Sequence, residues 1–193
     1  MVRSDSSRGQ SMLEFALIAP IFFLLLFGIM EFGVLMFDTA TSRFAASEAA
    51  KVEAQVGDQN LQCSKVAGCP AIYGNAVGTM CDADCQAIIA IHATALGSTS
   101  LEQVNYIEVQ KMQASGQPFS PVAVNRFNLN GTAISGYSSY TSGNRNVIAG
   151  STDYLQVNIN FTYRWLTGIF NKLLAQPVLD SKFLVRLEPQ KFS

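Results

Sequence analysis

The N-terminal part of the chain contains a long uncharged stretch, and this stretch restricts the fold more than any other feature. Residues 15–30 carry no charge, and the apolar sequence resumes after Glu31 as far as Phe37. A bilayer core of about 30 Å needs about 20 helical residues, so residues 12–31 alone are long enough to cross it. A single segment in lipid must satisfy its own backbone hydrogen bonds, which a helix does. The sequence therefore predicts a transmembrane helix over residues 10–37.

A cleaved secretory signal is the first alternative interpretation of this stretch. Such signals have a basic head, an apolar run of about 7–15 residues and small residues at the cleavage site. Arg3 and Arg8 supply the basic head, but the apolar run is too long, and Glu31 and Phe32 stand where small residues belong. The segment is therefore expected to stay attached. The two arginines are expected to hold the N-terminus in the cytoplasm and to place the rest of the chain across the membrane.

Gly9 and Glu14 stand at the start of the apolar run, with Glu14 in the fifth position after the glycine. On its own, Glu14 is explained as an interfacial carboxylate favoured by the helix dipole. Together, the two residues resemble the class III leader of type IV prepilins. That resemblance implies cleavage between Gly9 and Gln10 by a prepilin peptidase, which makes residues 1–9 a leader. It also implies that Glu14 pairs with the new amine of a neighbouring subunit and so sets the packing register.

A longer pattern resembles the TadE-like proteins of tight-adherence (Flp) pilus systems. It consists of the run from Glu14 to Leu17, Pro20 and the run from Phe27 to Gly33, and residues 185–189 are similar to the family's closing R-x-E-P. The resemblance assigns subunit assembly and register to Glu14, Phe15 and Glu31.

The same resemblance implies a function and a location. The chain would be a minor pilin or pseudopilin that supports pilus assembly, with one pass through the bacterial inner membrane and residues 38–193 as a periplasmic head. Its partners would be the prepilin peptidase, other pilins or pseudopilins, the inner-membrane pilus platform and membrane lipid. Two alternatives stay open: a type II secretion pseudopilin, or a permanently anchored binding or adhesive domain that uses residues 130–150, including Tyr137 and Tyr140, as its contact loop.

The composition gives no support for several other functions. The net charge is −1, and a near-neutral balance does not indicate nucleic-acid binding. His92 is the only histidine, and no nucleophile motif or phosphate-binding glycine loop accompanies it. We therefore expect no enzymatic activity, cofactor, metal or small-molecule substrate, and we interpret His92 as a packed or surface helix residue.

Four cysteines fall close together beyond the predicted membrane helix, at Cys63, Cys69, Cys81 and Cys85. An even, clustered set in an oxidising periplasm predicts two disulfides, and three pairings are open. A metal site is a weaker interpretation, because the C-x₅-C spacing does not match the usual ligand pairs.

Periodicity predicts an α+β, pilin-like fold in which one long helix, transmembrane and then amphipathic, packs on an antiparallel sheet with a second short helix. The amphipathic part would bury a stripe that includes Phe37, Ala45 and Ala49. Strict alternation over residues 155–165 predicts a half-buried strand with Trp165 in the core. The remaining predicted elements are helices at 10–56, 83–96 and 168–175, with Asp82 or Asp84 as a cap, strands at 105–111, 122–129 and 179–187, and a loop at 130–150.

Overall fold

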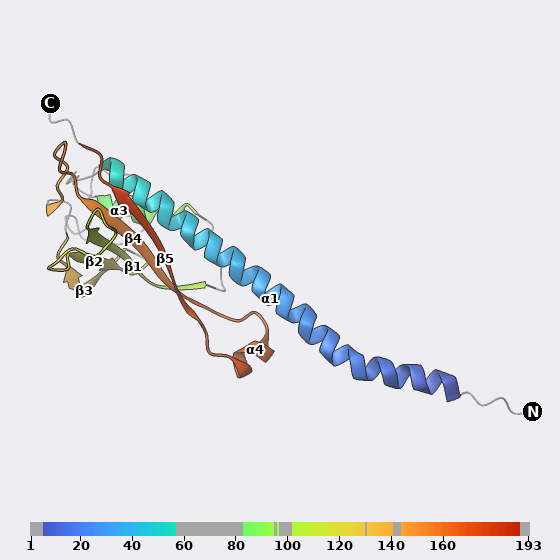
Figure 1. Cartoon of the computed structure of the whole chain (residues 1–193). Helices are drawn as coiled ribbons and strands as arrows, with labels where there is room; N and C mark the ends of the chain where they lie inside the picture. Colours follow the sequence, from blue (N-terminus) through green and yellow to red (C-terminus); the bar gives the residue numbers. More distant parts are fainter. Residues whose placement is uncertain are drawn as a thin grey trace, which may run out of the picture.

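A computed structural model describes residues 6–56, 83–94, 96, 102–129, 131–140 and 144–189. Within these residues the chain has one very long helix, two short helices and five strands (Figure 1). The long helix extends far beyond the rest of the molecule, which gathers around its C-terminal half. This is the α+β arrangement that the sequence predicts.

Helix α1, Ser6–Val56, is 51 residues long and runs without interruption through Pro20. At 1.5 Å per residue it measures about 77 Å. It begins four residues before Gln10, so the last part of the predicted leader continues the helix. Among the described residues this is one helix that is long and apolar enough to cross a membrane, with a mean hydropathy of 2.4 over its best window and none of that window buried.

The five strands form one antiparallel sheet in the order β3-β2-β1-β4-β5. The central pair is long and continuous, with Ile107 opposite Ile159 and Val109 opposite Val157. Strand β4 buries its predicted apolar face, and the side chains of Leu155 and Phe161 are fully buried. The strand is not half-buried along its middle, because Asn158 and Asn160 on the opposite face are also buried. The strands are β1, Glu102–Met112; β2, Val124–Phe127; β3, Ala133–Ser138; β4, Tyr154–Tyr163; and β5, Val178–Arg186.

The core of the head lies between the sheet, helix α3 (Ala83–His92) and the second half of α1. Helix α1 packs against α3, β4 and β5. Its buried face is made mainly of alanine, which lets the sheet and α3 approach its backbone closely. The fully buried alanines are Ala45, Ala46, Ala49 and Ala50. The predicted stripe is correct at Ala45 and Ala49, but Phe37 is 60% exposed and faces away from the head.

Two expectations for the sheet region are wrong. The predicted loop at 130–150 contains strand β3, and Tyr140, expected to be free for a partner, is 1% exposed in the core. Strand β4 ends at Tyr163, so Trp165 lies beyond it and is only half-buried. Strand β3 escaped prediction because it is a short edge strand with mostly exposed, small or polar side chains, which give no alternation of apolar residues.

Candidate functional site

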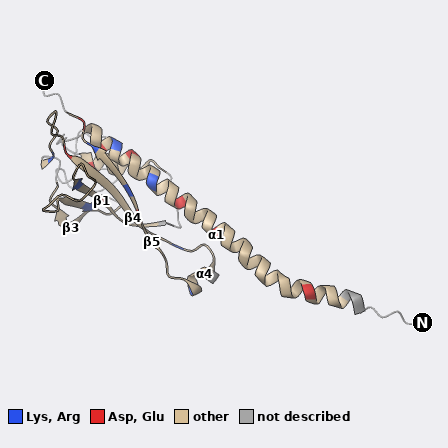
Figure 2. Cartoon of the chain, viewed as in Figure 1, with Lys and Arg blue, Asp and Glu red and all other residues tan. Residues whose placement is uncertain are grey.

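The N-terminal half of α1 extends away from the described part of the head along most of its length (Figure 1). Its large apolar side chains are open, among them Met12, Leu17, Ile21 and Leu25, each of which is at least 59% exposed. Figure 2 shows this half of the helix without charge between one acidic residue near its start and the next acidic position near the head. Such a surface needs a cover of lipid or of other apolar helices.

The predicted cleavage and register residues lie on this open helix. Nothing lies within 4 Å of a Cβ built on Gly9, so the backbone around the predicted Gly9-Gln10 bond is accessible. The Gln10 side-chain amide donates to Oε1 of Glu14 over 3.2 Å on the exposed surface. Phe15, one residue further, is 71% exposed. Gly9, Gln10, Glu14 and Phe15 are therefore brought together by one helix and are free of the head.

Glu31 has a different position from the other two residues assigned to assembly. Its side chain is 1% exposed because the connection between β4 and β5 covers it. The backbone N–H of Leu166 donates to Oε1 over 2.5 Å, and the N–H of Thr167 donates to Oε2 over 3.2 Å. The Tyr163 hydroxyl donates to Oε1 over 3.4 Å. Glu31 therefore fastens the head to α1, a role that the sequence pattern did not indicate.

Asp38 lies two turns after Glu31 on the same side of α1 and is 2% exposed. Its Oδ2 has no hydrogen-bond partner among the described residues. Burial raises the pKa of Asp38 above its ordinary value of 3.8. Burial also raises the pKa of Tyr163 to about 12, and the nearby charges of Glu31 and Asp38 add to that shift. The junction between the apolar half of α1 and the head is thus acidic and poorly hydrated.

A buried ion cluster holds the far end of the head, and no pattern in the sequence indicated it. The Arg145 guanidinium donates to Oε2 of Glu53 over 2.5 Å and also to Asp84. All three side chains are almost completely buried. Asn125 donates to Asp84 over 3.0 Å. Asp84, expected as a helix cap, is in the first turn of α3 and its carboxylate binds these two partners.

The remaining predicted residues lie in structural positions or outside the described chain. The His92 ring Nε2 lies 2.6 Å from the carbonyl oxygen of Leu129, so His92 is a packed helix residue. Cys85 is fully buried in α3 and is not a free thiol. Cys63, Cys69 and Cys81 lie outside the described residues, so the predicted disulfides and their pairing stay predictions.

Comparison with known families agrees with this geometry. A family model described as TadE-like protein matches residues 9–51, which begin at Gly9 and end in the helix that packs on the head. Residues 9–51 are a TadE-like segment. The resemblance predicted from the Glu14 and Phe27 runs is confirmed over this range. No curated protein and no solved structure matches the chain.

The TadE-like segment associates the protein with the tight-adherence (Tad/Flp) pilus system. It comprises the exposed apolar half of α1 and most of the alanine face, so it contains both the surface that needs a cover and the surface that carries the head. The open helix is compatible with a single-pass membrane anchor. The R-x-E-P match lies outside the segment; there, Arg186 donates to Thr152 over 2.7 Å and the Glu188 N–H donates to the Ala54 carbonyl over 3.0 Å.

Proposed function

We propose that the protein is a minor pilin or pseudopilin of a tight-adherence (Flp) pilus, trimmed by a prepilin peptidase after Gly9. The observation that carries this proposal is the open N-terminal half of α1, which is apolar, uncovered by the head and headed by Gly9 and Glu14. A simple anchor needs no such carboxylate at the start of its lipid-facing helix, where charge is costly. A subunit that packs with other helices has a use for it.

In this proposal the mechanism is association. The N-terminus stays in the cytoplasm and the head lies in the periplasm. After cleavage, Gln10 carries a free amine, and Glu14 of one subunit pairs with that amine on a neighbouring pilin, while the inner-membrane platform is a further partner in assembly. The Gln10 side chain donates to Glu14 within one helix, so the Glu14 carboxylate lies close to the residue that would carry the new amine. Disulfides among Cys63, Cys69, Cys81 and Cys85 would stabilise the head in the periplasm.

Intact mass measurement tests the cleavage step. The protein is purified from cells with and without a prepilin peptidase, and we expect an N-terminus at Gln10 only in the first. Gly9→Leu is expected to keep the full-length mass in both, because a branched side chain obstructs the entry of an extended backbone into a narrow cleft. Gly33→Leu is the matched control, since its surroundings on α1 are equally open. Full-length protein in both strains, or a trimmed Gly9→Leu variant, would refute the proposal.

A further inference from the structure

The connection between β4 and β5, residues 164–177, extends past the end of the sheet and lies beside α1 (Figure 1). It contains the short helix α4, Gly168–Leu173. Two contacts fix its level along α1: the Glu31 carboxylate binds its first turn, and a Cβ built on Gly28 would lie 4.0 Å from Cζ of Phe170. Gly28 belongs to the uncharged stretch, so the connection descends beside the part of α1 that is expected to lie in lipid.

The outer surface of this connection exposes several leucines next to polar side chains such as Asn171 and Gln176. Leu166 is 47% exposed, Leu173 is 68% exposed and Leu174 is 50% exposed. Charge is confined to Arg164 and Lys172, which are exposed and long enough to extend toward water or phosphate. An exposed leucine group flanked by basic side chains is typical of segments that lie in the membrane interface.

Trp165 is placed at the start of the same connection. Its indole Nε1 donates to the Ala175 carbonyl oxygen over 3.1 Å, which closes the connection into a compact unit. Its ring packs edge-on against Tyr163 and tilted against Phe170, with centroid separations of 5.5 and 5.8 Å. Tyrosine and tryptophan gather at the level of lipid headgroups, where one end of the ring is apolar and the other is wet.

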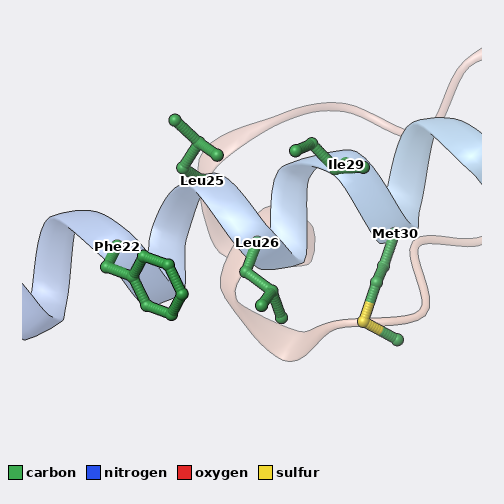
Figure 3. A pocket seen from close by; sticks show the side chains of 5 residues that line it. All are labelled: Phe22, Leu25, Leu26, Ile29 and Met30. Carbon is green, nitrogen blue, oxygen red and sulfur yellow. The ribbon is translucent and has the colours of Figure 1, made fainter.

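The surface of α1 next to this level is also suited to lipid. A shallow groove of about 410 Å³ lies on the helix, and only apolar atoms line it. Figure 3 shows its lining side chains, Phe22, Leu25, Leu26, Ile29 and Met30, which all come from α1. Ile29 and Met30 stand at the same height as the contact between Gly28 and Phe170. Exposed apolar side chains are therefore present both on α1 and on the connection near this level.

We propose that residues 164–177 form a second membrane-contacting element, which lies in the outer interfacial layer of the bilayer beside α1. Leu173 and Leu174 enter the upper acyl-chain region, Trp165 lies at the headgroup level and Lys172 reaches the lipid phosphates. The Glu31 carboxylate holds the element at this depth. With two contacts to the bilayer, the head has a defined tilt and rotation relative to the membrane. The inference requires that α1 spans the membrane, but not that the protein is a pilin.

Depth-dependent quenching of Trp165 tests this inference, because Trp165 is the single tryptophan of the chain. The full-length protein is reconstituted into vesicles of phosphatidylcholine and phosphatidylglycerol that carry bromine near the headgroup end, the middle or the methyl end of the acyl chains. We expect strong loss of fluorescence with the shallow label, weaker loss with deeper labels and little quenching by aqueous iodide. Resistance to alkaline extraction is measured on the same vesicles to report the insertion of α1.

A pair of variants ties the signal to the leucines. The double variant Leu173→Asp with Leu174→Asp is expected to lose quenching by shallow bromine and to gain quenching by iodide. Ile148→Asp is the matched control, since Ile148 is 62% exposed but lies in the 144–153 loop, which the Arg145 cluster holds at the other end of the head. We expect it to behave like the unmodified protein.

Three results would overturn the inference. Iodide quenching without lipid quenching, in a chain that resists extraction, would place the connection in water. Shielding from both quenchers would mean that the head itself or a second copy of the chain, not lipid, covers Trp165. Extraction of the whole chain would refute the anchor as well, whereas a failed cleavage test with the expected quenching would refute only the pilin function.

Discussion

At the scale of single residues, Asp38 and Asp180 are carboxylates whose environments shift their pKa in opposite directions. Burial raises the pKa of Asp38 above 3.8. For Asp180, burial also raises the pKa, but hydrogen bonds from Asn160 and Asn158 and the charge of Lys182 lower it by more, so the pKa of Asp180 is below its ordinary value. A group whose pKa is higher in the folded state stabilises the protein at pH values below its unfolded-state pKa. This stability is lost as the pH rises through the folded-state pKa. A group whose pKa is lower in the folded state stabilises the protein at pH values above its unfolded-state pKa. This stability is lost as the pH falls through the folded-state pKa.

We therefore expect Asp38→Asn to raise Tm at pH 7, because it removes a charge that is buried without a partner for Oδ2 among the described residues. Asp180→Asn has the same chemistry and is the matched control, with an expected decrease in Tm at pH 7. Below about pH 3 both differences are expected to shrink, since both carboxylates approach the protonated form. Thermal unfolding of the micelle-bound protein, followed by circular dichroism, measures the change. A lower Tm for Asp38→Asn at pH 7 would contradict the prediction.

At the scale of elements, Glu31 determines where the β4–β5 connection rests on α1. Its carboxylate accepts from two successive backbone N–H groups, at Leu166 and Thr167, which no strand partner satisfies. Removing an acceptor from a buried donor costs about 1–3 kcal/mol. We expect Glu31→Ala to open this connection locally while the sheet stays folded, because β1 and β4 are held by their own ladder.

Hydrogen exchange measures this opening at the two amides. We expect the Leu166 and Thr167 amides to exchange at least about tenfold faster in Glu31→Ala, as expected from a loss of about 1.4 kcal/mol. Glu31→Gln keeps one acceptor oxygen and should give a smaller change. Glu14→Ala on the open part of α1 should give none. Unchanged exchange in Glu31→Ala would show that packing of Phe170, not the carboxylate, holds the connection.

At the scale of the whole molecule, the Arg145 cluster joins side chains from three separate parts of the head. Glu53 belongs to α1, Asp84 to α3, and Arg145 to the connection before β4. Removing one partner of a buried ion cluster is strongly destabilising, because the opposite charges stay buried and unpaired. We expect Arg145→Ala to lower the free energy of unfolding by about 3–5 kcal/mol.

Urea unfolding followed by the circular dichroism of the sheet measures this cost. Adding Glu53→Gln and Asp84→Asn to Arg145→Ala should recover part of the loss, because the neutral pair no longer carries unpaired charge. Arg164→Ala is the control, since Arg164 is exposed and binds only Gln103 among the contacts described for it, over 2.7 Å. A loss below about 1 kcal/mol for Arg145→Ala, the size of a surface pair, would contradict the prediction.

Features that depend only on neighbouring residues could be predicted from the sequence. The uncharged run gives α1 its apolar half, the Gly9–Glu14 pattern and the runs around it identify the TadE-like segment, and alternation places β4. Edge strand β3 is local too, but its small, exposed side chains carry no such pattern.

The partners of the buried ionic side chains depend on how distant segments pack, so they could not be predicted from the sequence. Glu31 and the groups that donate hydrogen bonds to it are 132–136 positions apart, and Arg145 and Glu53 are 92 apart. No periodicity connects residues at such separations, because their partners are chosen when α1 and the sheet pack together. A carboxylate in an apolar helix is costly wherever it lies, so the sequence marks Glu14 and Glu31 alike. The fold leaves Glu14 open and encloses Glu31, because the connection between β4 and β5 lies against α1 at Glu31.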